Sequence, residues 1–230
     1  MAKYNNKSSE FVKKLKMHKP DDMEYYVPMS NDKDIHKFVD RCEKVIRASK
    51  EYRDYIAFLK ENVGLDSCIF FQKVTQNKNA KQRGKISLEL HHEPFTLYDI
   101  VKVVVTKYKE EGLPMNDLLI ADEVLDLHYS NKVGLVPLSK TAHEMVHNST
   151  KLFVPLNMVY GNYSSFLEEY ELYLDKNPEL YQKLEKKLDM TKNLTPESFE
   201  ALTKEFTYIE VPEYEDIEKV PIEVTNNQTA

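Results

Sequence analysis

Two histidines lie four residues apart in the stretch His143-Glu144-Met145-Val146-His147. An α-helix completes one turn in 3.6 residues, so this spacing places both imidazoles on one helical face, a single turn apart. Ser139 precedes the stretch and is a good N-cap for a helix that begins at Lys140. The sequence therefore predicts a short helix that presents two imidazoles to one point.

A second pair, His91-His92, follows Ile86, Leu88 and Leu90, which alternate with polar residues. This period of two is typical of a half-buried strand. From the end of that strand, His91 could reach the ion that the helical pair would bind. Three neutral imidazoles suit zinc, nickel or another borderline transition metal, and they leave a position for water or substrate.

The remaining patterns predict a mainly helical chain. Only five glycines occur in 230 residues, and neither of the common glycine-rich phosphate loops is present. We expect helices at about Lys33–Asn62, Thr96–Glu111, Asp117–Tyr129, Ser164–Asp175, Pro178–Leu188 and Pro196–Glu205, and strands in Ser67–Gln76, Gly84–His92 and Lys132–Leu138. His128 should interact with free carbonyls at the end of its helix, or else support the site from behind.

Composition excludes several classes of protein. Cys42 and Cys68 form no C-x-x-C pair, which argues against a disulfide framework or a cysteine-rich zinc site. No segment approaches the roughly 20 apolar residues of a membrane helix, and the N-terminus has no signal-peptide core. We therefore expect no membrane contact and a cytoplasmic location, in a bacterial or phage-infected cell.

Charge is distributed unevenly along the chain. The net charge is −6, yet residues 73–109 carry eight basic and three acidic residues, and residues 196–230 carry nine acidic residues and two lysines. A protein with such a basic middle and acidic end can dock a polyanion through one face. We expect a flexible arm at 1–30, a core at 31–175, and C-terminal helices with an acidic tail at 176–230.

The five-residue stretch also fits H-E-x-x-H, the helix signature of zinc proteases. In a protease, His143 and His147 would bind zinc and Glu144 would be the general base. Glu168 or Glu169 lies at a plausible distance for the third ligand. This interpretation leaves His91-His92 without a task.

A different interpretation uses all four histidines. The segments "LELHHEP" and "NKVGLVPLSKTAHEMVH" resemble the HNH, or ββα-metal (His-Me finger), endonuclease family, and most closely its colicin-type branch. The resemblance covers residues 86–148. It implies that His91, His143 and His147 are metal ligands and that His92 is the general base.

One family residue is displaced in this chain. The family orients its base histidine with an asparagine, and Gly134 occupies that place. Asn131, three residues earlier, could serve as the catalytic asparagine if the loop is rearranged. Two predicted helices, Thr96–Glu111 and Asp117–Tyr129, would form an insertion between the two strands.

These expectations combine into one hypothesis. The fold would be α+β, with a ββα-metal finger and its helical insertion inside a mainly helical scaffold. The protein would be an endonuclease that uses one divalent ion (Zn, Ni, Mg or Mn) and acts on nucleic acid, DNA rather than RNA. The alternatives are a zinc protease and a non-catalytic, phage-encoded binding protein, whose acidic tail mimics nucleic acid and contacts a protein partner.

Overall fold

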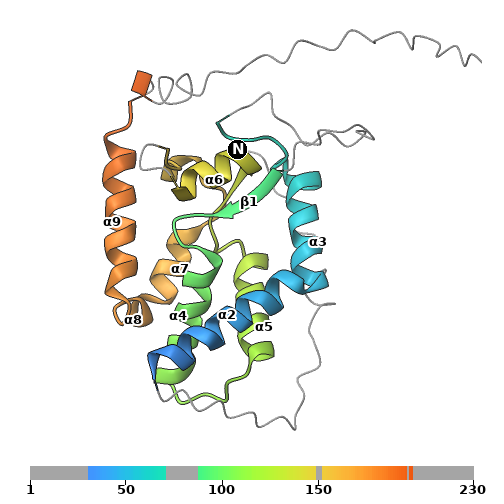
Figure 1. Ribbon diagram of the computed structural model, residues 1–230, viewed down its shortest axis with the longest axis vertical. Coiled ribbons are helices and arrows are strands. Elements are labelled where there is room, and N and C mark those ends of the chain that lie inside the picture. Colours follow the sequence, from blue (N-terminus) through green and yellow to red (C-terminus); the bar gives the residue numbers. More distant parts are fainter. Residues whose placement is uncertain (1–30, 71–87, 149–151, 196, 199–230) are drawn as a thin grey trace, which may run out of the picture.

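The computed structural model describes residues 31–70, 88–148, 152–195 and 197–198. Helices dominate this part of the chain, and its one sheet has two antiparallel strands, which confirms the predicted α+β class (Figure 1). The expected arm at 1–30, the acidic tail and most of the predicted helix at 196–205 lie outside the described residues. Among the described helices, none is long and apolar enough to cross a membrane.

The first predicted helix is divided into three elements: α2 (Asp32–Ala48), α3 (Lys50–Phe58) and the π-helical η1 (Leu59–Val63). The prediction of one continuous helix was wrong at Ser49, whose extended backbone (φ −65°, ψ 150°) interrupts it. The Ser49 hydroxyl accepts a hydrogen bond from the Tyr52 amide and so caps α3. Gly64, at φ 91°, ends η1 within two residues of the helix end predicted at about Asn62, and glycine is the usual residue at such a stop.

The sheet pairs β1 (Leu88–His92) with β2 (Leu135–Ser139), and His91 lies opposite Val136. Helix α6 (Lys140–Asn148) follows β2 directly, and the Ser139 hydroxyl accepts from the Ala142 amide at 3.2 Å, as a predicted N-cap should. The strand expected at 67–76 does not form over 67–70, where Ser67 makes an isolated β-bridge and the Ile69 amide donates to the Pro137 carbonyl of β2. Residues 71–76 lie outside the described part.

Two helices, α4 (Leu97–Glu110) and α5 (Asp117–Tyr129), connect β1 to β2. Both were predicted within one residue of these bounds. Their apolar faces pack with α2 into the largest core, whose fully buried members include Val39, Ile46, Val101, Val104, Ile120 and Val124. These two helices are therefore a principal part of the largest core.

The C-terminal part comprises η2 (Leu156–Met158), α7 (Tyr163–Glu169), α8 (Glu171–Leu174) and α9 (Pro178–Lys192). The helix predicted at 164–175 is interrupted at Tyr170, whose backbone (φ −109°, ψ 15°) leaves the helical region. Its buried ring stacks on Phe166 and its hydroxyl hydrogen-bonds Glu123. Tertiary packing at Tyr170 thus accompanies a break that helical periodicity did not reveal.

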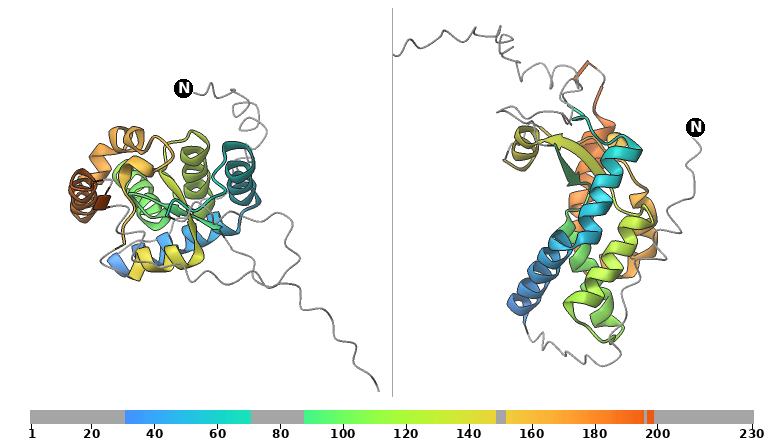
Figure 2. Two further views of the ribbon diagram at one scale, coloured as in Figure 1. Left: turned by 90° about the horizontal axis from the view of Figure 1, so that it is seen from above. Right: turned by 90° about the vertical axis from the view of Figure 1, so that its right-hand side faces the viewer.

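The sheet and α6 lie at one end of the molecule, between two helical walls. Figure 1 shows α3 on one side of β1 and α9 on the other, and Figure 2 shows α2 and α3 as a bent column beside the sheet. Lys187 of α9 contacts Glu93 just beyond β1, and the Lys60 ammonium of η1 donates to the Leu88 carbonyl at 2.5 Å. One wall therefore contacts the first residue of β1, and the other contacts the residue that follows its last.

Candidate metal centre

Three histidines from two elements converge on one point. His91 comes from β1, and His143 and His147 come from successive turns of α6. One ligand atom from each lies within 4.8 Å of the others, and the His143 and His147 Nε2 atoms are 3.1 Å apart. Two nitrogens on one tetrahedral zinc ion, at Zn–N of about 2.0–2.1 Å, are about 3.3 Å apart. The three imidazoles therefore suit a zinc-type ion as a donor set, and the spacing of the His143 and His147 nitrogens fits one.

Carboxylates behind two of these rings select the nitrogen that faces the centre. Glu93 Oε2 lies 3.2 Å from His91 Nε2, and Glu89 Oε2 lies 2.8 Å from His143 Nδ1. A carboxylate accepts, so these ring nitrogens carry the protons and leave His91 Nδ1 and His143 Nε2 as lone-pair donors. Metal-binding histidines in proteins are oriented in this way by carboxylates.

Burial keeps two of these histidines in the protonation state that a metal requires. Desolvation, followed by the neighbouring histidines, lowers the pKa of both His143 and His147. Burial would raise the pKa of Glu93, but the hydrogen bond from His91 and the charge of Lys187 outweigh it and lower this pKa below its ordinary value. His143 and His147 are thus held neutral, and the Glu93 carboxylate behind His91 is held charged.

His92 points to a different partner. Its Nε2 lies 2.9 Å from Nε2 of His128, which is fully buried on α5. The His128 Nδ1 atom lies 2.6 Å from the Val124 carbonyl, so the predicted carbonyl contact is present inside the helix rather than at its free end. Burial, and then His128 and Arg47, hold the pKa of His92 well below its ordinary value.

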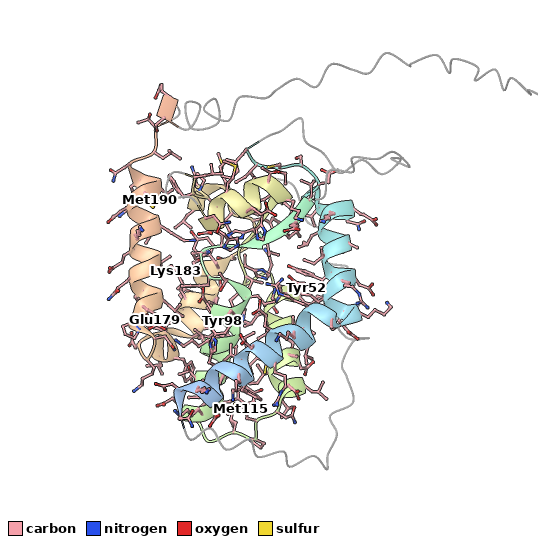
Figure 3. The ribbon with its side chains drawn as sticks, in the orientation of Figure 1. Tyr52, Tyr98, Met115, Glu179, Lys183 and Met190 are labelled. Carbon is pink, nitrogen blue, oxygen red and sulfur yellow. The ribbon has the colours of Figure 1, made fainter. Side chains whose placement is uncertain are left out.

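A pocket of about 480 Å³ joins the metal-type cluster to His92. Tyr52 of α3 forms part of its wall, and Figure 3 shows this side chain directed into the molecule. Two cations also line the pocket: Arg47 from the last turn of α2 and Lys60 from η1. The remaining lining residues are Ile56, Leu88, Glu89, Leu90, His91, His92, Thr96, Leu97, His143 and His147.

The other residues singled out in the sequence lie elsewhere. Asn131 is exposed in the loop after α5, at φ 58°, and does not line the pocket. Gly134 permits a close approach, because a Cβ there would lie 1.8 Å from the Glu93 carbonyl oxygen. Glu144 is 61% exposed beside Lys140, and Glu169 pairs with Lys132. The described histidine cluster thus takes its third member from β1 and not from Glu168 or Glu169.

Sequence reasoning missed the residues that support the histidines. Glu89 and His91 share one face of β1, since they are two positions apart in a strand, and Glu93 continues the same period. That alternation, E-x-H-x-E, was the signal available in the sequence. Arg47 and Lys187 carried no such signal, because α2 and α9 reach the site only through the tertiary fold. Figure 3 labels Lys183, which extends from the same helix to Asp99 of α4.

Comparison with known proteins identifies the group to which the chain belongs. Neither the curated proteins nor the solved structures contain a match. The model of one family, the bacteriophage G278-like virion proteins, matches residues 1–218. This match extends over nearly the whole chain, including both strands, α6 and every histidine described above. The protein is therefore a member of the bacteriophage G278-like virion protein family.

Proposed function

We propose that this virion protein is a metal-dependent endonuclease that hydrolyses nucleic-acid phosphodiesters. The observation that carries the proposal is the shared pocket, in which the three-histidine cluster, His92 and two cations face one space. His91, His143 and His147 would hold one divalent ion, and His92 would be the general base. The β1–β2–α6 arrangement supports assignment as a ββα-metal finger, with α4 and α5 as its insertion.

The titratable and charged groups that line the pocket could each contribute to phosphodiester hydrolysis. Burial keeps the His92 ring neutral, so one of its nitrogens is unprotonated and can accept the proton of an attacking water. Arg47 and Lys60 offer positive charge to a phosphate. A bound divalent ion would supply Lewis-acid stabilisation of the charge that develops on the phosphate. DNA is the proposed substrate, because the colicin-type branch that the two segments resemble consists of DNases.

The geometry offers less support for a protease. That mechanism requires Glu144 to reach a metal-bound substrate, but its side chain is 61% exposed and does not line the pocket. It also leaves the buried His92–His128 pair without a function.

The proposed cytoplasmic site of action stays a prediction, as does any contact of the acidic tail with a protein partner.

Nicking of supercoiled plasmid tests the proposal. Purified protein would be assayed with Mg²⁺, Mn²⁺, Ni²⁺ and Zn²⁺ in turn, beside an EDTA-treated sample. We expect metal-dependent nicking that falls by about 10²–10⁴-fold in His92→Ala and in the better-packed His92→Gln, the usual contribution of a general base. Glu144→Gln is the matched control and should nick at the wild-type rate.

Three results would contradict the proposal or part of it. A folded wild-type protein that cuts neither plasmid nor single-stranded DNA or RNA with any metal would favour a non-catalytic binding protein. Unchanged nicking in both His92 variants would remove His92 as the base. Loss of activity in Glu144→Gln with retention in the His92 variants would favour the protease-type use of α6.

A further inference from the structure

His128 lies directly behind His92 and is the innermost titratable group near the pocket. Its side chain is fully buried, and each of its ring nitrogens has one partner: Nδ1 lies 2.6 Å from the Val124 carbonyl and Nε2 lies 2.9 Å from His92 Nε2. A buried chain of hydrogen bonds therefore runs from the backbone of α5, through two imidazoles, to the wall of the pocket.

The Val124 carbonyl, at one end of this chain of hydrogen bonds, determines which ring nitrogens carry protons. A carbonyl can only accept, so His128 must donate from Nδ1. In the neutral ring, Nε2 of His128 then carries a lone pair and must accept from His92. His92 therefore carries its proton on Nε2, and its Nδ1 is the unprotonated nitrogen. Acting through His128, the Val124 carbonyl thus determines which nitrogen of His92 is basic.

The surroundings keep the pair neutral and fixed. The Tyr52 ring stacks nearly parallel to His92, and the rings of Tyr52 and Tyr55 meet His128 edge to face. Burial lowers the pKa of His128 to about 4, so this ring stays neutral at physiological pH. In the alternative tautomer of His128, an unprotonated Nδ1 would face the Val124 carbonyl oxygen, so two lone pairs would lie against each other. The aromatic rings around His128 would not relieve this repulsion.

We infer that His128 is the positioning residue of the proposed reaction, and that it fixes His92 in the Nε2–H tautomer with Nδ1 as the base atom. The inference rests on the proposed function for its catalytic part. It assigns to the inserted helix α5 the orienting task that the family resemblance gives to an asparagine. Asn131, which does not line the pocket, is then free of that task, and Gly134 has no side chain that could perform it.

Substitution at position 128 tests the catalytic part. His128→Leu replaces the imidazole with an apolar side chain of similar size and removes the acceptor, whereas His128→Gln can still accept from His92 and donate to Val124. We expect His128→Leu to lower the kcat of plasmid nicking by about 100-fold with KM and metal affinity unchanged, and His128→Gln to recover to within about tenfold of wild type. His36→Leu, at an exposed histidine outside the pocket, is the matched control.

Imidazole ¹⁵N NMR provides a reading that does not depend on activity. In the wild-type protein we expect His92 as the Nε2–H tautomer and His128 as the Nδ1–H tautomer, and in His128→Leu a mixture of tautomers at His92. His92 protonated on Nδ1 in the wild type, or a single unchanged tautomer in His128→Leu, would overturn the inference.

The two arms separate this inference from the proposed function. Nicking by His128→Leu at the wild-type rate, or equal losses in His128→Leu and His128→Gln, would overturn the positioning role while the nuclease stands. If the wild-type protein cuts no substrate, the proposed function fails, and the NMR arm alone decides whether His128 sets the tautomer of His92.

Discussion

His91 Nε2 lies 3.2 Å from Glu93 Oε2, and both side chains are almost fully buried, at 6% and 1% exposure. Glu93 also pairs with Lys187 of α9. One carboxylate thus orients a candidate metal ligand and anchors the C-terminal helix to the end of β1. A buried charge of this kind is costly unless it is paired and hydrogen-bonded, and here both conditions are met.

Glu93→Gln should weaken metal binding. The amide keeps the shape of the side chain but loses the charge that makes His91 a stronger donor, and loss of such a partner typically costs about 10–100-fold in affinity. Competition with a zinc-binding chromophore would measure the change. Glu144→Gln, the same substitution at an exposed site on α6, should leave affinity unaltered. Equal affinities for Glu93→Gln and wild type would limit Glu93 to its pairing with Lys187.

Metal should stabilise the folded protein through the three histidines. A ligand at 100 times its dissociation constant adds about 2.7 kcal/mol to the free energy of unfolding, which for a chain of this size raises Tm by about 5–10 °C. Differential scanning fluorimetry with and without Zn²⁺ would detect the shift. It should disappear in His147→Ala and persist in His36→Ala, whose histidine lies outside the cluster. A full shift in His147→Ala would show that the ion binds elsewhere.

Gly134→Ala should be strongly destabilising. The added Cβ would lie 1.8 Å from the Glu93 carbonyl oxygen and 2.6 Å from Val159 Cγ1, so backbone must move. We expect a loss of about 3 kcal/mol or more in urea unfolding, at the upper end of overpacking effects. Gly112→Ala is the comparison, because nothing lies near its Cβ and only its positive φ of 63° is strained, at about 1–2 kcal/mol.

The same clash predicts what happens when the asparagine of the resembled family is introduced at position 134. Gly134→Asn would restore the asparagine that the resemblance expects, yet we predict that it unfolds the region and does not raise activity. A folded Gly134→Asn variant with faster nicking would contradict both the steric argument and the role assigned to His128.

Cys42 should be unreactive in the native protein. It is fully buried on α2, and desolvation, followed by the charge of Asp117, raises its pKa to about 12. At pH 8 only about one molecule in 10⁴ would then carry the nucleophilic thiolate. In a Cys68→Ala background, a thiol reagent should therefore label the protein slowly until urea is added. Rapid labelling under native conditions would show that α2 opens locally.

Local chemistry explains which parts of the fold could be predicted. The N-cap at Ser139, the stop at Gly64 and the bounds of α4 and α5 depend on neighbouring residues, and the structure has them. The breaks at Ser49 and Tyr170 were missed, because the flanking residues keep helical periodicity and the breaks accompany packing against other elements.

The sequence by itself determined that His143 and His147 share a helical face and that His91 and His92 end a strand, since both follow from the periods of helix and strand. Only the tertiary structure decided which partners these histidines meet. Antiparallel pairing of strands separated by residues 93–134 brings His91 to α6, and the position of α5 beside the end of β1 brings His128 to His92. Contacts between residues so distant along the chain leave no periodic signal, because they depend on how whole elements pack and not on the conformation of any one of them.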